Sequence, residues 1–298
     1  MSVRLNPNIL PDLLTSIQES RGNLNTATQQ LSSGRRVNQL SDDPSAAAQL
    51  VANHDQAAQD DQFLQNLSGL QSKFQVADST MSSVVTLLTR AVSIGTEGAN
   101  GTVSASDRQA IAGEVQGLLT QLVSLGNTSY QGAYLFAGTA STTQPFTLDP
   151  ATQQVVYNGN GNSNAVALLN GASVKSNVPG SQLFQNASGN AMSALGDLYH
   201  ALQTGNNIAG ALSEVESALS EVSVQRVFYG NVLNQITSSE NFLSQDKVNL
   251  SSQENTLVGV DPAVAATDLA QSQTAYQSDL AATGQILNLP SLLDFLVH

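Results

Sequence analysis

The sequence predicts a mainly α fold: an elongated antiparallel helical rod built from both ends of the chain, with a small β-rich outer domain in the middle. Apolar residues recur every seven positions over long stretches near both ends. A segment rich in Gly, Asn and Thr separates these stretches. Only 11% of residues are charged, 5% are aromatic and none is Trp, whereas an average globular protein is about 25% charged. This composition disfavours a large compact core.

Heptad repeats predict the helices, and capping residues mark where they begin and end. Six helices are expected, at 8–33, 45–94, 107–125, 191–202, 211–257 and 263–287. Gly34 is typical of a helix C-cap, because glycine tolerates a positive φ. Asp42 or Asp43 can cap the second helix, with Pro44 in its first turn. At ~1.5 Å per residue, the helix at 211–257 would be roughly 70 Å long, which implies a rod.

Two sets of heptad residues carry the structural predictions. The core of the rod is predicted at Leu67, Phe74, Met81, Leu88, Val222, Tyr229, Ile236 and Leu243. An assembly interface is predicted on the two terminal helices, at Leu10, Ile17, Leu24, Leu31, Leu269, Tyr276, Leu280 and Leu287. Polar or small residues such as Ser20 and Gln273 interrupt the apolar row of each terminal helix, which we call its seam. Each terminal helix should therefore be only marginally stable alone and should become ordered against a partner.

The middle of the chain has a different pattern. Residues 146–148 and 154–157 flank a turn at 149–152 and predict a β-hairpin, and further short strands fit 165–169 and 172–175. Lys175 is the only charge between Pro150 and Gly196. With so few charges to tie it to the helices, we expect this region to be separable from them. The predicted division is 1–44 and 259–298 as coiled-coil-forming ends, 45–129 and 190–258 as the rod, and 130–189 as the outer domain.

No constellation of residues predicts an enzyme, and no catalytic, metal or cofactor site is expected. His54, His200 and His298 are far apart in sequence, and the adjacent pairs Asp42-Asp43 and Asp60-Asp61 cannot face each other on a helix. A net charge of −13, from 23 acidic and 10 basic side chains, argues against nucleic-acid binding. Without Cys there are no disulfides. Neither a cleaved signal peptide nor a membrane-inserting segment is expected.

Four segments resemble the bacterial flagellin superfamily. Residues 31–50, LSSGRRVNQLSDDPSAAAQL, resemble its N-terminal signature, and the alanine-rich C-terminal helix with Asp268-Leu269-Ala270 resembles its C-terminal domain. Residues 132–139, GAYLFAGT, and the terminal SLLDFL resemble the branch of this superfamily that joins hook to filament. Arg226 and the segment 230–234 match both that branch and flagellin, so they do not discriminate.

The resemblance implies a structural protein of the bacterial flagellum that assembles into a ring between the hook and the filament. It implies self-association, contacts with a neighbouring hook-associated protein and with flagellin, and an export chaperone on the C-terminal helix. It also implies an extracellular location reached by type III export of an uncleaved chain. Two alternatives stay open: a short flagellin that forms the filament itself, and a secreted adhesin or tip protein whose β-rich region binds a host ligand.

Overall fold

The computed structural model describes residues 9–167, 173–186 and 189–287. Contacts divide the chain into two compact units, which we call the terminal unit (1–60 with 245–298) and the central unit (61–244). Two long helices, α2 (Pro44–Gly98) and α6 (Ile208–Val258), contribute residues to both units. Most of the described chain is helical, and helices from both chain ends frame a few short strands. The mainly α fold class is thereby confirmed.

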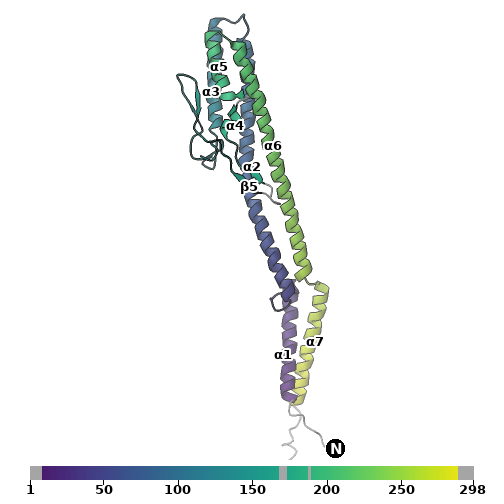
Figure 1. The fold of residues 1–298 in the computed structure, drawn as a ribbon. Helices are drawn as coiled ribbons and strands as arrows, with labels where there is room; N and C mark the ends of the chain where they lie inside the picture. The colour runs from purple at the N-terminus through teal and green to yellow at the C-terminus, as the bar shows by residue number, and fades with distance from the viewer. Residues whose placement is uncertain (1–8, 168–172, 187–188, 288–298) are drawn as a thin grey trace, which may run out of the picture. The chain divides into compact units, whose positions relative to one another are not determined.

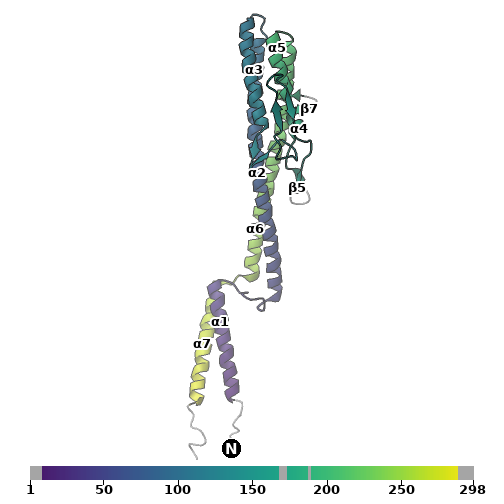
Figure 2. The same ribbon diagram turned by 90° about the vertical axis from the view of Figure 1, so that its left-hand side faces the viewer.

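The terminal unit holds a pair of helices, α1 (Ile9–Ser33) and α7 (Pro262–Leu287). They lie side by side in Figures 1 and 2. The pair is antiparallel, because Ser20 in α1 bonds Asp279 late in α7, whereas Arg35, just after α1, bridges Gly259, just before α7. Gly34 ends α1 with φ +69°, as its C-cap role predicts.

The central unit is built on α2 and α6, to which α3 (Ala105–Gly126) and α5 (Ala191–Thr204) are added. Ser104 caps α3 by accepting a hydrogen bond from the backbone N–H of Asp107. The predicted end of α2 at residue 94 is wrong, because the helix continues through Gly95 to Gly98. A Cβ on Gly95 would lie 3.0 Å from Leu212 and 3.2 Å from Leu198, so this glycine serves close helix packing.

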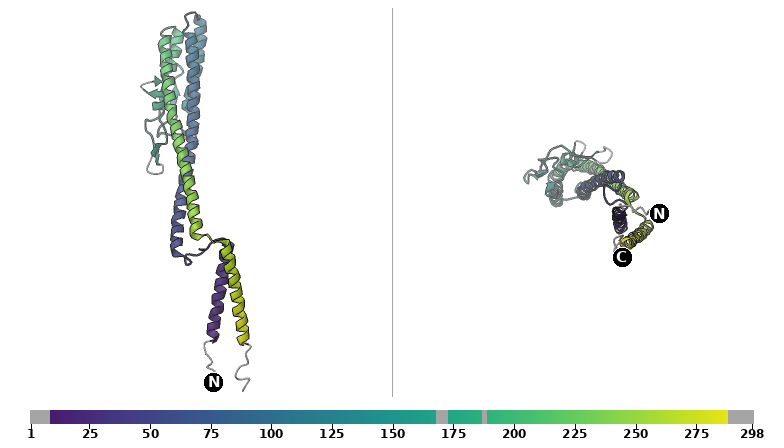
Figure 3. Two further views of the ribbon diagram at one scale, coloured as in Figure 1. Left: turned by 90° about the vertical axis from the view of Figure 1, so that its right-hand side faces the viewer. Right: turned by 90° about the horizontal axis from the view of Figure 1, so that it is seen from below.

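The strands form four separate antiparallel pairs. They are β1 (Ser129–Tyr130) with β2 (Ala133–Tyr134), β3 (Phe146–Leu148) with β4 (Val155–Tyr157), β5 (Ala165–Ala167) with β6 (Ser173–Lys175), and β7 (Gln185–Asn186) with β8 (Gly189–Asn190). The β3–β4 pair is the predicted hairpin. A short helix that the sequence pattern did not indicate, α4 (Gly180–Phe184), interrupts the strands. Figure 3 shows the strand pairs on one flank of the helices of the central unit.

The middle segment is tied to the helices by contacts that carry no charge. Asn127, which ends α3, donates from Nδ2 to the carbonyl of Phe146 and accepts the Phe146 N–H at Oδ1, both at 2.9 Å. Phe146 and Phe136 each pack edge-on against Phe184, with ring centroids 5.6 and 5.4 Å apart. All three rings are fully buried in the core that α2, α3, α5 and α6 share. The ties are apolar and amide contacts, which a count of charges cannot reveal.

Candidate assembly surface

The loop between α1 and α2 clamps the terminal unit. The backbone N–H of Arg36 donates to the carbonyl of Val258 at 2.7 Å, and the N–H of Val260 donates to the carbonyl of Gly34 at 3.1 Å. The side chain of Arg36 adds a bond to the carbonyl of Leu257 at 2.9 Å, and Arg35 forms an ion pair with Glu254. The start and the end of the chain are therefore fastened together where α1 and α7 begin to pair.

The adjacent carboxylates of Asp42 and Asp43 accept hydrogen bonds from backbone N–H groups in this loop and at the start of α2. Asp42 Oδ2 accepts the backbone N–H groups of Asn38 and Gln39, both at 2.9 Å. Asp43 is the residue that caps α2, since its Oδ1 accepts the N–H of Ala46 at 3.1 Å. This backbone bond, with help from Ser45 and Arg36, lowers the pKa of Asp43 to about 2. The charged carboxylate is thus matched to the helix N-terminus.

The predicted interface residues of the terminal helices are only partly covered. Ile17 and Leu24 of α1 and Leu269 and Tyr276 of α7 are half-buried. Leu31 and Leu280 are exposed, at 37% and 45% of their full area. Leu10 and Leu287 belong to the helices, but their side chains lie outside the described residues. Apolar surface is therefore left available along this helix pair.

The sequence did not point to the residues that join α1 and α7. Asp279 of α7 accepts a hydrogen bond from Ser16 at 3.2 Å and another from Ser20. Ala27 of α1 and Ala265 of α7 are the buried residues of this helix pair among the side chains that the structure describes. The heptad pattern predicts Ser20 as an interruption of the apolar row, not as a contact residue. The contact between α1 and α7 therefore buries little apolar area and includes hydrogen bonds to the carboxylate of Asp279.

All eight residues predicted for the core of the rod lie buried in the structure. They are Leu67, Phe74, Met81 and Leu88 of α2, with Val222, Tyr229, Ile236 and Leu243 of α6. Two charged side chains of α6, Arg226 and Glu240, reach across to α2. Arg226 Nε lies 3.0 Å from Asp78 Oδ1, and Glu240 accepts from Gln71 at 3.2 Å. Burial is the main cause that raises the pKa of Tyr229.

One face of α6 exposes apolar side chains with no cover. Val224 and Val227 are exposed, and Phe242 is 53% exposed. Residues 224 and 242 are 18 apart, which is five turns at 3.6 residues per turn, so they share a face. They are ~27 Å apart along the helix axis, so they are separate exposed apolar side chains and not one contiguous patch.

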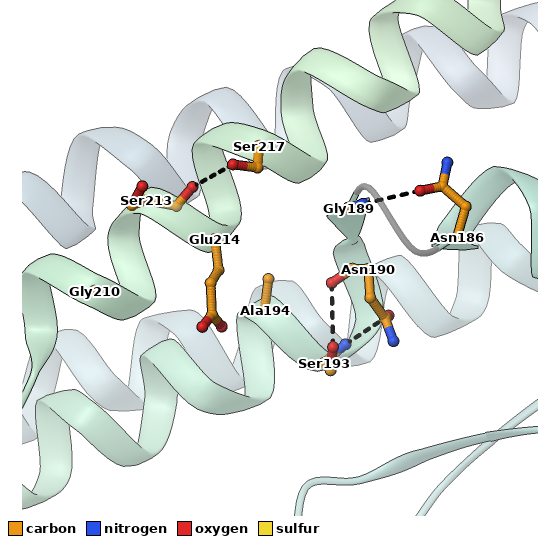
Figure 4. Close-up of a pocket in the computed structure, with 9 residues that line it drawn as sticks. All are labelled: Asn186, Gly189, Asn190, Ser193, Ala194, Gly210, Ser213, Glu214 and Ser217. Carbon is orange, nitrogen blue, oxygen red and sulfur yellow. Dashed lines mark hydrogen bonds between the residues drawn. The ribbon is translucent and has the colours of Figure 1, made fainter.

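The structure also has pockets that resemble no catalytic site. The pocket in Figure 4, of about 470 Å³, lies among β7, β8, α5 and α6, and Glu214 is the only charged residue lining it. His54 lies 3.4 Å from Glu254, and His200 contacts the carbonyl of Thr152 at 3.0 Å; His298 lies outside the described residues. Among the described residues, no three His, Asp or Glu side chains gather as metal ligands. Nor does any helix in this part of the chain have the length and hydropathy to cross a membrane.

The fold and this surface define a class of protein in which helices from both chain ends pair and leave apolar seams for further contacts. The chain belongs to the bacterial flagellin family. The flagellin N-terminal helical region matches residues 9–141, and the flagellin C-terminal helical region matches residues 212–296.

Similar proteins from several bacteria extend this result. Flagellar hook-associated protein 3 of Escherichia coli K12 is 28% identical over 281 residues, covering 85% of this chain and 87% of that protein. The protein of the same name in Salmonella typhimurium is 27% identical and covers 89% and 90%. Flagellin A of Vibrio cholerae is 32% identical but covers only 46% of this chain and 37% of that flagellin.

Solved structures show the same fold. FlgL of Bacillus cereus has a TM-score of 0.58 at 23% identity, and covers 70% of this chain and all of that one. Hook-associated protein 3 of Legionella pneumophila has a TM-score of 0.63 at 17% identity, and covers 69% and 98%.

Proposed function

We propose that this chain is a structural subunit of the bacterial flagellum that forms the junction between the hook and the filament. Its subunits would assemble into a ring, with a neighbouring hook-associated protein on one side and flagellin on the other. It acts by assembly and not as an enzyme. The observation that carries the proposal is the similarity to two hook-associated proteins. It covers 85% and 89% of this chain, and 87% and 90% of those proteins.

The alternative of a short flagellin is less well supported. The flagellin of Vibrio cholerae matches over less than half of this chain, whereas the hook-associated proteins also match through the strand-bearing middle. Since a filament needs very many subunits and a junction needs one ring, the two roles differ in abundance in isolated flagella.

The assembly surface would be the exposed side of the α1–α7 pair. Its half-buried seam, with Leu31 and Leu280 exposed, leaves apolar area that neighbouring copies can cover. Before assembly the same area would favour aggregation. A chaperone groove that holds α7 as an amphipathic helix would shield it. Export of the uncleaved chain to the extracellular flagellum by the type III route completes the proposal.

A secreted adhesin is the remaining alternative. Its proposed binding region is the middle segment, but the phenylalanine rings of that segment (Phe136, Phe146 and Phe184) are buried in the shared core and are not displayed. Binding of the intact chain to host-cell surfaces would favour this alternative.

A gene deletion separates these roles. We expect cells without this chain to keep their hooks, to lack filaments and to release unassembled flagellin into the medium. Restoring the chain from a plasmid should restore the filaments. If the deleted strain still grows filaments of normal length, the junction role is wrong. If filaments are lost because flagellin itself is missing from both cells and medium, the chain is the flagellin.

A further inference from the structure

A surface groove of about 520 Å³ lies in the central unit between α2 and the chain around the β1–β2 hairpin. Leu70 and Lys73 of α2 form one side, Tyr130 and Leu135 form the other, and Val166 of β5 closes one end. None of the residues that line the groove is acidic. The groove is thus an apolar trough with a single positive charge.

Lys73 lacks a counter-ion within the described chain. Its side chain is half-buried, and its ammonium group makes no hydrogen bond or ion pair with any described residue. Burial lowers the pKa of Lys73, which is the expected effect when no anion compensates the loss of water. An unpaired charge in such a place is costly.

Lys175 is the other lysine of the central unit, and it does not line the groove. It pairs in register with Ala165 of β5, so its side chain lies on the strand face opposite to that of Val166. It is exposed, and it too has no partner among the described residues. The remaining basic side chains of the central unit are engaged, because Arg90 pairs with Glu114, Arg226 pairs with Asp78, and Arg108 donates to the carbonyl of Val103.

We propose that this groove receives an acidic side chain from a second copy of this chain, so that Lys73 meets a carboxylate across a subunit contact. A second copy supplies such groups in excess, with 23 acidic residues against 10 basic ones. Copies that each carry a charge of −13 repel one another. A groove in which Lys73 faces a carboxylate offsets part of this repulsion and fixes the register of neighbouring subunits. The inference rests on the proposed self-assembly.

A matched pair of glycine variants tests whether the groove must be open. Gly69 lines the groove, and a Cβ there meets no atom within 4 Å. Gly117 of α3 is equally open and helical but lies outside the groove. Leucine is a better helix former than glycine, so both Gly69→Leu and Gly117→Leu should fold. We expect Gly69→Leu to lower the amount of this protein retained on isolated flagella by at least about fivefold, and Gly117→Leu to leave it unchanged.

A charge series tests the role of Lys73. Lys73→Arg should keep retention near that of the unmodified chain, whereas Lys73→Glu should lower it as much as Gly69→Leu does. Circular dichroism of each purified variant checks that its helices are intact. Equal retention of all four variants would overturn the proposal.

Photo-crosslinking identifies the occupant. A photoreactive phenylalanine analogue replaces Asn66, an exposed residue that lines the groove, and intact flagella are irradiated. A crosslinked species of twice the subunit mass, joined to a peptide that contains Asp or Glu, supports the inference. Crosslinks to flagellin or to another hook-associated protein overturn it while the junction role stands. Absence of the unmodified chain from flagella contradicts both.

Discussion

The ring of Phe74 in α2 packs against the ring of Tyr229 in α6, with centroids 5.5 Å apart and planes inclined by 51°. Phe74 is 1% exposed and Tyr229 is 2% exposed. Both residues were predicted for the core from heptad spacing alone. The contact joins two helices that are more than 100 positions apart in sequence, so it holds together the parts of the central unit supplied by the two halves of the chain.

Truncation of this contact should destabilise the protein strongly. Phe74→Ala removes a fully buried ring and leaves a cavity, for which we expect a loss of about 3–5 kcal/mol of unfolding free energy. Phe242→Ala is the matched control, because Phe242 also lies in a long helix but is 53% exposed, and it should change stability by less than about 0.5 kcal/mol. Urea unfolding followed by circular dichroism measures both. Similar losses in the two variants would mean that the Phe74–Tyr229 contact is not a core contact.

The heptad pattern predicts the long helices well because their burial repeats with the helical period. It fails where packing is decided by contacts distant in sequence. The predicted helix end at residue 94 is wrong, because Gly95 lies inside the helix, where the approach of Leu198 and Leu212 selects glycine. Asp279 gave no signal, since its serine partners lie in α1, at the other end of the chain. Phe146 ties the middle segment to the helices through neighbours that a local pattern does not contain.

The cap of α2 should make stability depend on pH in a defined range. The pKa of Asp43 falls from an ordinary 3.8 to about 2 in the folded chain. A lowered carboxyl pKa stabilises the folded state above pH ~3.8, and this contribution is lost as the pH falls through ~2. Asp43→Asn keeps a capping oxygen but cannot titrate. Unfolding free energies of both proteins, measured between pH 6 and pH 2, should converge on acidification. A constant difference across that range would rule out the carboxylate cap.

The exposed seam of α7 should matter more for assembly than for folding. Leu280 is 45% exposed, so Leu280→Asp should cost the isolated chain well under the ~2 kcal/mol of a fully buried leucine. In a proposed contact with a neighbour or a chaperone, the same change places a charge in an apolar interface. We therefore expect fewer filaments per cell and weaker recovery of the chaperone in pull-down experiments.

Gln277→Asp is the control for this charge. Gln277 is exposed on α7, three residues from Leu280, and its substitution should change neither filament number nor chaperone recovery. If the two variants behave alike, the seam is not the interface.

The α1–α7 pair should open more readily than the central unit. Ala27 and Ala265 are the only fully buried side chains of the pair among the described residues, its larger apolar side chains are at most half-buried, and a hydrogen-bonded carboxylate joins the helices. The central unit instead buries four phenylalanine rings, of Phe74, Phe136, Phe146 and Phe184. Small apolar burial gives a low free energy of local opening. Limited proteolysis of the dilute chain should cut first within 9–33 and 262–287, and trim it toward residues 45 and 260.

Hydrogen exchange on the same sample supplies the comparison. Amides of α1 and α7 should exchange faster than those of α2 between residues 67 and 94. Equal protection in both regions would show that the α1–α7 pair is stable without partners. It would contradict the prediction that these helices become ordered only on assembly.

The position of the chain along the flagellum tests the junction proposal most directly. Gold-labelled antibody against an exposed tag at Gly161, where a side chain would meet open space, locates the protein by electron microscopy of intact flagella. The account predicts one cluster of label per flagellum, at the boundary between hook and filament. Label distributed along the whole filament, or found only at its far tip, would contradict it.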